Sequence, residues 1–408
     1  WTWKAGGSKG TFNKDGVDMG SAANAKMSVG SLNSEAYNQS AVWSNGVTTN
    51  GVASFSDLFD GNFGTSAQQT TNGTPATISG FGPITVQNKV SFYSPDGNAR
   101  YRLNLGEERY IDGAGWHDIE FTGTLSSFSF QAPGNSRIFI YGMMIDGKLL
   151  VNNGVSVANI PSIAATASSV GTKQGFSIIK YTGSGSNGTI PHGLSQAPDF
   201  FFGRDLDDTG GSRDWIIYHK VVGGSGRLKF NNDPTSSSSV FFQNQQTRDT
   251  HITIGTSNDI NSTNDYILYC WHDVPGLQKF GSYTGTGSEN FVELGFRPAL
   301  VMVKRAVVNS SPDSDTSHSA WVIMDSERLS YNGLTPNHLY ANHSTGEGKR
   351  GDASGTSSLT DMTLEPMSNG FYLNGPGTET NANTGTYVYA AWAEAPTFNL
   401  YGGQSNAR

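Results

Sequence analysis

The sequence predicts an all-β protein built of tandem β-sandwich domains of the jelly-roll or lectin-like kind. First, glycine numbers 51 and charged residues reach only 15%, below the usual quarter, while aromatic residues at 11% can pin several small cores. Second, short apolar segments alternate with polar residues, as in 90–94 (VSFYS) and 128–131 (FSFQ). Third, the segment 175–275 recurs over 280–396. A chain of 408 residues is long enough for several such domains.

Residues 1–40 are expected to form an N-terminal attachment or oligomerisation segment that is irregular or partly helical. The stretch 18–27 is rich in alanine and could make two helical turns, although glycine and asparagine weaken that pattern. Trp1 and Trp3 are too apolar to remain in water. We therefore expect them to pack on another chain or on the following domain.

Residues 41–157 are predicted to form a β-sandwich. Asp146 and Gly147 lie between two apolar runs, and this dipeptide is the strongest short signal for a two-residue hairpin turn with positive φ at both positions. The predicted strands of this domain are 86–93, 99–105, 115–121, 126–131, 138–145 and 148–152.

The rest of the chain divides around the repeat. Residues 158–174 are small, polar and irregular in pattern, which predicts a linker. Repeat module 1 then covers 175–276 and module 2 covers 277–396, and a C-terminal tail of 397–408 belongs to neither.

The two modules share a set of landmarks. Each opens with a tyrosine motif, 181–185 (YTGSG) and 283–287 (YTGTG), and each closes on an aromatic strand. The distance between matching positions grows along the repeat, so length variation belongs to the loops between landmarks. We predict that the landmark tryptophans fill the two cores, and that ligand recognition depends on the loops that differ between the two modules. The landmarks are Tyr181, Trp215 and Trp271 in module 1, and Tyr283, Trp321 and Trp392 in module 2.

Charge and cysteine usage exclude several classes of protein. The net charge is −8 with no basic run, so nucleic acid is not an expected partner. The longest apolar stretches are of strand length, which argues against a membrane span. Cys270 is the single cysteine, so no internal disulfide can form. That usage favours a protein assembled in a reducing cytoplasm.

No pattern predicts an enzyme. Acidic residues fall in Gly- and Asn-rich loops, and no spacing selects the carboxylate pair of a glycosidase. The spacing Gly-x-Ser-x-Gly occurs once, at 6–10 (GGSKG), but in a segment expected to be irregular and not between a predicted strand and helix, as a serine nucleophile elbow requires; a zinc-type histidine pair is absent from the sequence. No cofactor is expected. Calcium is the metal that would suit an acidic loop, because calcium prefers the hard oxygen donors that carboxylates provide. The candidate calcium loop contains Asp205, Asp207 and Asp208.

Several phrases of the modules resemble a known repeat. The segments 175–183 (GFSIIKYTG), 190–199 (IPHGLSQAPD) and 264–276 (NDYILYCWHDVPG) are similar to a repeat in tail-fibre and structural proteins of marine phages that infect cyanobacteria and related bacteria. The tail 397–408 resembles the C-terminus of that group. This resemblance implies a virion protein, assembled in the host cytoplasm, that forms a homotrimer and contacts other virion proteins.

The middle domain carries a second resemblance. The phrase 58–65 (LFDGNFGT) resembles a turn of discoidin-type sandwiches, whose end loops often bind sugars, lipids or a structural cation.

Together these observations predict a virion-surface adhesin that binds host glycans through loops of β-sandwiches. Host polysaccharide or lipopolysaccharide is the expected partner, since the chain is rich in uncharged polar groups. Aromatic residues of the variable regions are the candidate glycan contacts, namely Trp43, Trp116 and Tyr331. These aromatics could equally fill a subunit interface. A purely structural virion protein, such as a capsid protrusion or tail connector, is the first alternative, and a polysaccharide depolymerase is the second.

Overall fold

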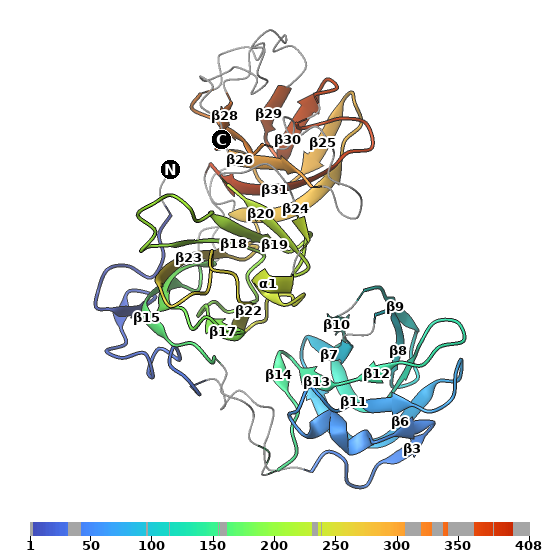
Figure 1. Cartoon of the computed structure of the whole chain (residues 1–408). Helices are drawn as coiled ribbons and strands as arrows, with labels where there is room; N and C mark the ends of the chain where they lie inside the picture. The colour runs from blue at the N-terminus through green and yellow to red at the C-terminus, as the bar shows by residue number, and fades with distance from the viewer. Residues whose placement is uncertain are drawn as a thin grey trace. The chain divides into compact units, whose positions relative to one another are not determined.

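The computed structural model confirms the all-β prediction. In its described residues short strands dominate, with one 3-10 turn, Phe55–Phe59, and one helical turn, α1, Ser239–Phe242 (Figure 1). The structure describes residues 3–31, 42–94, 97–113, 115–153, 155, 161–230, 236–237, 239–306, 320–328, 338–341, 363–377 and 379–394.

The chain forms two compact units. One, the repeat unit, combines the N-terminal segment up to Ser28 with Ile163–Gln243 and the chain from Thr247 onward. The other, the middle sandwich, contains Val29–Ser162 and Asn244–Gln246. The middle sandwich is therefore inserted between two parts of the repeat unit.

The middle sandwich packs its sheets around a phenylalanine-rich core that includes Phe81, Phe92 and Phe128. Its sheets have the orders β3-β6-β11-β8-β9, β10-β7-β13-β14 and β12-β5-β4. The strands are β3 Thr48–Asn50, β4 Val52–Ala53, β5 Ala67–Gln69, β6 Ala76–Val86, β7 Lys89–Ser94, β8 Ala99–Leu103, β9 Arg109–Ile111, β10 Gly115–Glu120, β11 Gly123–Gln131, β12 Phe139–Ile140, β13 Gly142–Ile145 and β14 Lys148–Leu149.

The predicted hairpin of this unit is confirmed. Asp146 and Gly147 have φ values of 50° and 79°, and β13 pairs with β14 across them. The Asp146 carboxylate also accepts the backbone amides of Gln87, Asn88 and Lys89 at 2.8–3.0 Å. One residue thus shapes its own turn and holds the neighbouring turn between β6 and β7. The strands before Val86 were not predicted, because their glycines and polar residues hide the alternation.

Two predictions, one for the segment 158–174 and one for the segment 18–27, are wrong. Strand β15, Ala165–Gly171, occupies much of the predicted linker, because its small side chains let it lie between β16 and the N-terminal strand β1, Phe12–Lys14. The predicted helix over 18–27 is a series of turns after β2, Val17–Asp18, and Lys26 there has a φ of 58°. These turns deliver Met27 to the module 1 core.

Each module contains one large and one small sheet. Module 1 has the orders β2-β1-β15-β16-β23-β18-β19-β20-β21 and β17-β22; module 2 has β24-β31-β26-β27-β28 and β25-β30-β29. The remaining strands are β16 Phe176–Thr182, β17 Gly188–Pro191, β18 Phe200–Asp205, β19 Ile216–His219, β20 Gly226–Lys229, β21 Ser236–Ser237, β22 His251–Ile254, β23 Asp265–Trp271, β24 Gln278–Thr284, β25 Asn290–Glu293, β26 Pro298–Arg305, β27 Val322–Asp325, β28 Leu339–Tyr340, β29 Thr363–Met367, β30 Gly370–Asn374 and β31 Thr386–Ala393.

The same hydrogen bonds recur in both modules. Buried Asn261 accepts the Ser184 amide at 2.8 Å and donates to two carbonyls, those of Ser186 and Gly255. Its counterpart, buried Asn381, accepts the Thr286 amide at 3.0 Å and likewise donates to the carbonyls of Ser288 and Gly375. We call this arrangement, in which a buried Asn261 or Asn381 side chain accepts one amide and donates to two carbonyls, the asparagine clasp. It was not predicted from the repeat because the loop that contains the asparagine differs in length between the two modules.

The landmark tyrosines are equally repeated. Tyr181 stacks on Tyr266 at 5.3 Å, and Tyr283 stacks on Tyr387 at 5.2 Å. The hydroxyls of Tyr181 and Tyr283 donate to carbonyls next to the asparagine of the clasp. The tyrosine contacts are therefore repeated in both modules. The landmark tryptophans do not fill the two module cores as predicted: Trp271, Trp321 and Trp392 lie in a separate cluster where the large sheets meet, and Trp215 is half-buried.

We expect Asn261→Ala and Asn381→Ala to destabilise the repeat unit by similar amounts, about 2–4 kcal/mol each. Each change removes a buried side chain and leaves one loop amide and two carbonyls without their partner. Urea unfolding followed by tryptophan fluorescence measures the loss. The control is Asn369→Ala, whose exposed side chain makes one 3.3 Å bond and should change stability by under about 0.5 kcal/mol. A negligible effect of both buried substitutions would contradict the role of the clasp.

The central strands are apolar on both faces because the two large sheets pack against each other. On β23 and β31 alternate residues point to the module's own core, and the others enter a separate shared cluster with Trp271 and Trp392. These two indoles lie 5.9 Å apart, and Trp3 packs edge-on against both. Figure 1 shows β18, β19 and β20 next to β24 and β31. The contact expected for Trp3 is thus made within the chain, whereas Trp1 lies outside the described residues.

Candidate ligand-binding site

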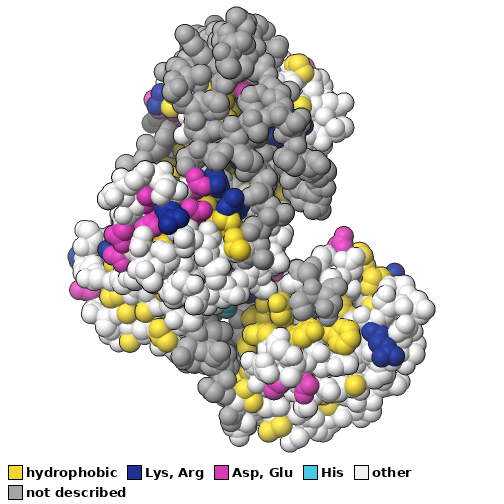
Figure 2. Space-filling model, viewed as in Figure 1, with side chains coloured by type: hydrophobic (Ala, Val, Ile, Leu, Met, Phe, Trp, Pro, Cys, Tyr) yellow, Lys and Arg dark blue, Asp and Glu magenta, His cyan; other side chains and the backbone are white. Residues whose placement is uncertain are grey.

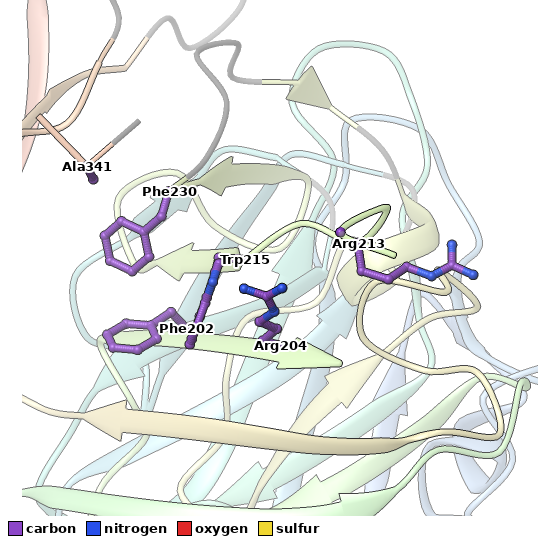
Figure 3. Close-up of a pocket in the computed structure, with 7 residues that line it drawn as sticks. Phe202, Arg204, Arg213, Trp215, Phe230 and Ala341 are labelled. Atoms are coloured by element: carbon purple, nitrogen blue, oxygen red, sulfur yellow. The ribbon is translucent and has the colours of Figure 1, made fainter. Parts of the chain in front are cut away.

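An open pocket of about 430 Å³ lies on module 1, at the side of the large sheet that faces module 2. Three aromatic side chains and two arginines dominate its lining, and Figure 3 shows Phe202 and Arg204 on β18 together with Trp215, just before β19, and Phe230, just after β20. The lining residues are Phe202, Arg204, Gly211, Arg213, Trp215, Phe230 and Ala341.

Trp215 reaches this pocket because of its place in the repeat. It precedes β19 as Trp321 precedes β27, so both indoles lie on the sheet face that meets the other module. Trp321 is fully buried there and donates from Nε1 to the Lys229 carbonyl at 3.0 Å. Trp215 is only half-buried, and the module 2 residue lining its pocket is Ala341. The two modules therefore use the same tryptophan differently.

Arg204 lies beside the indole. It follows Phe202 by two positions on β18, so both side chains leave the same face of the sheet. Its guanidinium carbon lies 5.4 Å from the centre of the Trp215 ring, a cation–π contact. In Figure 3 the indole stands edge-on between Arg204 and the rings of Phe202 and Phe230. The pocket therefore joins an aromatic wall to a positive charge.

The acidic loop 205–214 builds the rim of the pocket. Buried Asp205 accepts the Asp207 amide and the Asn264 side chain, and Asp207 accepts the Asp265 amide. Asp208 accepts the Arg213 amide at 2.8 Å, and this bond lowers the pKa of its carboxyl. The carboxylates predicted for calcium are thus engaged in shaping the loop. Among the described residues no group of three or more His, Cys, Asp or Glu side chains is arranged to hold a metal.

The predicted glycan aromatics lie in different surroundings. Trp43 packs against the core of the middle sandwich beside Phe81, with ring centres 6.2 Å apart. Tyr331 lies outside the described residues. Trp116 is half-buried on β10, with its ring centre 5.3 Å from Tyr93 and 6.0 Å from Phe63. Neither Trp43 nor Trp116 is one of the residues that line the module 1 pocket.

Trp116 belongs to an aromatic cluster with Phe63, Tyr93 and Tyr141. Phe63 comes from the turn that resembles discoidin-type domains, which Asp60 closes by accepting the Asn62 amide at 2.8 Å and the Thr65 hydroxyl at 2.5 Å. The cluster is partly exposed, and Figure 2 shows hydrophobic side chains gathered near β7 and β10. Gly142 lies directly beneath it: a Cβ there would come within 2.8 Å of the Phe63 ring, so a larger residue would require that ring to shift.

Two other groups with reactive side chains, the Lys220 ion pairs and His272, have a structural role. Lys220 joins Asp199 at 3.2 Å to Asp273 at 2.7 Å, and the Asp273 carboxylate also accepts the Phe280 amide. Burial and the nearby Asp273 charge raise the pKa of the Asp199 carboxyl. His272 is buried rather than exposed to a ligand. This group links the end of module 1 to the first strand of module 2.

Comparison with known families places the two modules together. A family model described as "Domain of unknown function (DUF7483)" matches residues 150–396, more than half of the chain. The chain belongs to this family. The DUF7483 match spans both repeats, which agrees with the shared cluster between their sheets. No curated protein matches the chain. In the described part of the chain no helix is long and apolar enough to cross a membrane.

Most of this DUF7483 pocket was not predicted. Trp215 was singled out as a core landmark, and Phe202, Arg204, Arg213 and Phe230 were not singled out at all. The alternation of Phe202 and Arg204 could have placed them on one face. Nothing in the repeat indicated that the partner module covers Trp321 and leaves Trp215 partly open.

Proposed function

We propose that the protein is a tail-fibre-like appendage of a phage virion that binds host cell-surface glycans. The observation that carries the proposal is the open pocket around Trp215, where an aromatic wall lies next to a guanidinium. The C–H groups on one face of a pyranose pack well on aromatic rings, and a few polar groups then fix the orientation of the sugar.

The architecture supports the same role. In the repeat unit two β-sandwich modules are joined through a shared apolar cluster, and this packing supports a shallow site on one of them. A single open pocket binds weakly, but a trimeric appendage would multiply the binding through avidity. The sequence resemblance to virion proteins of marine phages suggests both the trimer and the place on the particle.

The proposal is tested by the binding of purified protein to fixed host cells. We expect saturable binding that free host polysaccharide or lipopolysaccharide displaces, and about tenfold weaker binding for Trp215→Ala. No saturable binding would overturn the proposal and favour a purely structural virion protein. Release of reducing ends during long incubation would instead indicate a depolymerase. Electron cryo-microscopy of intact virions locates the protein on the tail or the capsid.

A further inference from the structure

We propose that the Trp215 pocket selects an acidic sugar, a pyranose bearing a carboxylate such as a uronic acid, with Arg204 as the partner of the carboxylate. This inference rests on the proposed glycan-binding function and names the class of glycan.

The first observation is the state of the arginine. Arg204 is half-buried against Trp215, and its side chain makes no ion pair with any residue of the described chain. Other basic groups of the same module do have acidic partners, as Lys229 pairs with Asp214 and Lys180 with Asp265 at 2.8 Å. A partly desolvated guanidinium next to an aromatic wall is therefore available to an anionic ligand.

The second observation concerns the nearby acids. Asp205 and Asp208 are close in sequence to the arginine, yet their oxygens accept hydrogen bonds from the loop itself and, for Asp205, also from the Asn264 side chain. They shape the rim of the pocket. Arg213 contributes further positive charge at that rim, although its side chain extends away from the indole in Figure 3. The charged side chains that line the pocket, Arg204 and Arg213, are therefore both cationic, on a chain whose net charge is −8.

The third argument is the match between both halves of the pocket and one ligand. Guanidinium groups bind carboxylates through two parallel hydrogen bonds, and more strongly when water is partly excluded. Phe202, Trp215 and Phe230 supply contact area only to a group that also has an apolar face. A free phosphate lacks such a face, and a neutral sugar leaves the charge of Arg204 without a partner. A uronic acid supplies both the apolar face and the carboxylate.

The test uses two matched probes, an oligosaccharide of glucuronic acid and the same oligosaccharide with its carboxyl groups reduced to alcohols. Calorimetry on the full chain measures both dissociation constants. We expect the acidic probe to bind at least about tenfold more tightly, with an affinity that falls as salt increases. Arg204→Gln should remove that preference and leave the weak binding of the reduced probe within about twofold. Trp215→Ala should weaken both.

The control variant is Arg227→Gln, because Arg227 also lies over an aromatic ring, that of Phe241 at 4.1 Å, but does not line the pocket. It should bind both probes as the unaltered protein does. Equal binding of the two probes, unchanged by Arg204→Gln, would overturn the acidic preference and leave glycan binding intact. Binding of neither probe, together with no binding to host cells, would overturn the proposed function itself. Displacement by inorganic phosphate alone would show a general anion site and overturn the sugar assignment.

Discussion

Trp321→Ala is expected to destabilise the repeat unit by about 3–5 kcal/mol, whereas Trp215→Ala at the equivalent position should cost about 1 kcal/mol. Trp321 is 0% exposed between the two large sheets, and its removal leaves a cavity and a Lys229 carbonyl without its donor. Trp215 stands at the open edge of the same contact, so truncation there leaves solvent-accessible space instead of a cavity.

Urea unfolding of the two variants beside the unaltered protein provides the measurement, with circular dichroism as the probe because each variant lacks one fluorophore. The pair is internally matched, since both changes remove the same side chain from the same position of the repeat. Equal losses of stability would contradict the conclusion that the modules use this tryptophan differently. A large loss for Trp215→Ala would also mean that its effect on glycan binding reflects folding.

Acidification from pH 7 to pH 4 is expected to destabilise the repeat unit through three buried histidines. Burial lowers the pKa of His192 and His219 to about 4 and that of His251 to about 3, with the nearby Arg248 charge also lowering the last. In the unfolded chain each of these histidines titrates with the ordinary pKa of a solvated imidazole, about 6.5. The unfolded state therefore carries more protons between those values, and stability falls as pH decreases through that window.

The geometry explains why the neutral rings are favoured. In His192 and His219, Nδ1 accepts a backbone amide and Nε2 donates to a carbonyl, at 2.8 Å to Arg248 and 3.1 Å to Tyr389 respectively. Protonation of Nδ1 would place two donors against each other. Each ring costs about 3 kcal/mol once the pH reaches 4. Asp199 acts in the opposite sense, because its raised pKa adds stability as its carboxyl is protonated.

Thermal unfolding at pH 7, 5.5 and 4.5 measures this effect. The variant His219→Gln keeps an amide donor without a titrating group, so its stability should change less steeply with pH than that of the unaltered protein. A flat profile of the unaltered protein over this range would show that these histidines are not buried in the folded state.

Much of the fold was predictable because it depends on local pattern. The Asp146-Gly147 turn needs only its own positive φ values, and the YTG motifs mark tyrosines that stack within each module. Strand β15 escaped prediction because small polar residues in an extended strand resemble those of a linker. It pairs with β16, the next strand in the chain, and with β1 from more than 150 residues away.

The candidate site separates more clearly what the sequence predicts from what tertiary packing decides. By itself the sequence determined the all-β class, the two modules and the landmark residues, since strand alternation and repetition are visible along the chain. Only the tertiary structure decided which landmark is open. Trp215 and Trp321 occupy the same repeat position on the same face of their sheets, and no local rule separates them. The difference arises because the apolar faces of two unequal modules pack together, which buries one indole under Lys229 and Phe230 and leaves the other at the edge beside Arg204.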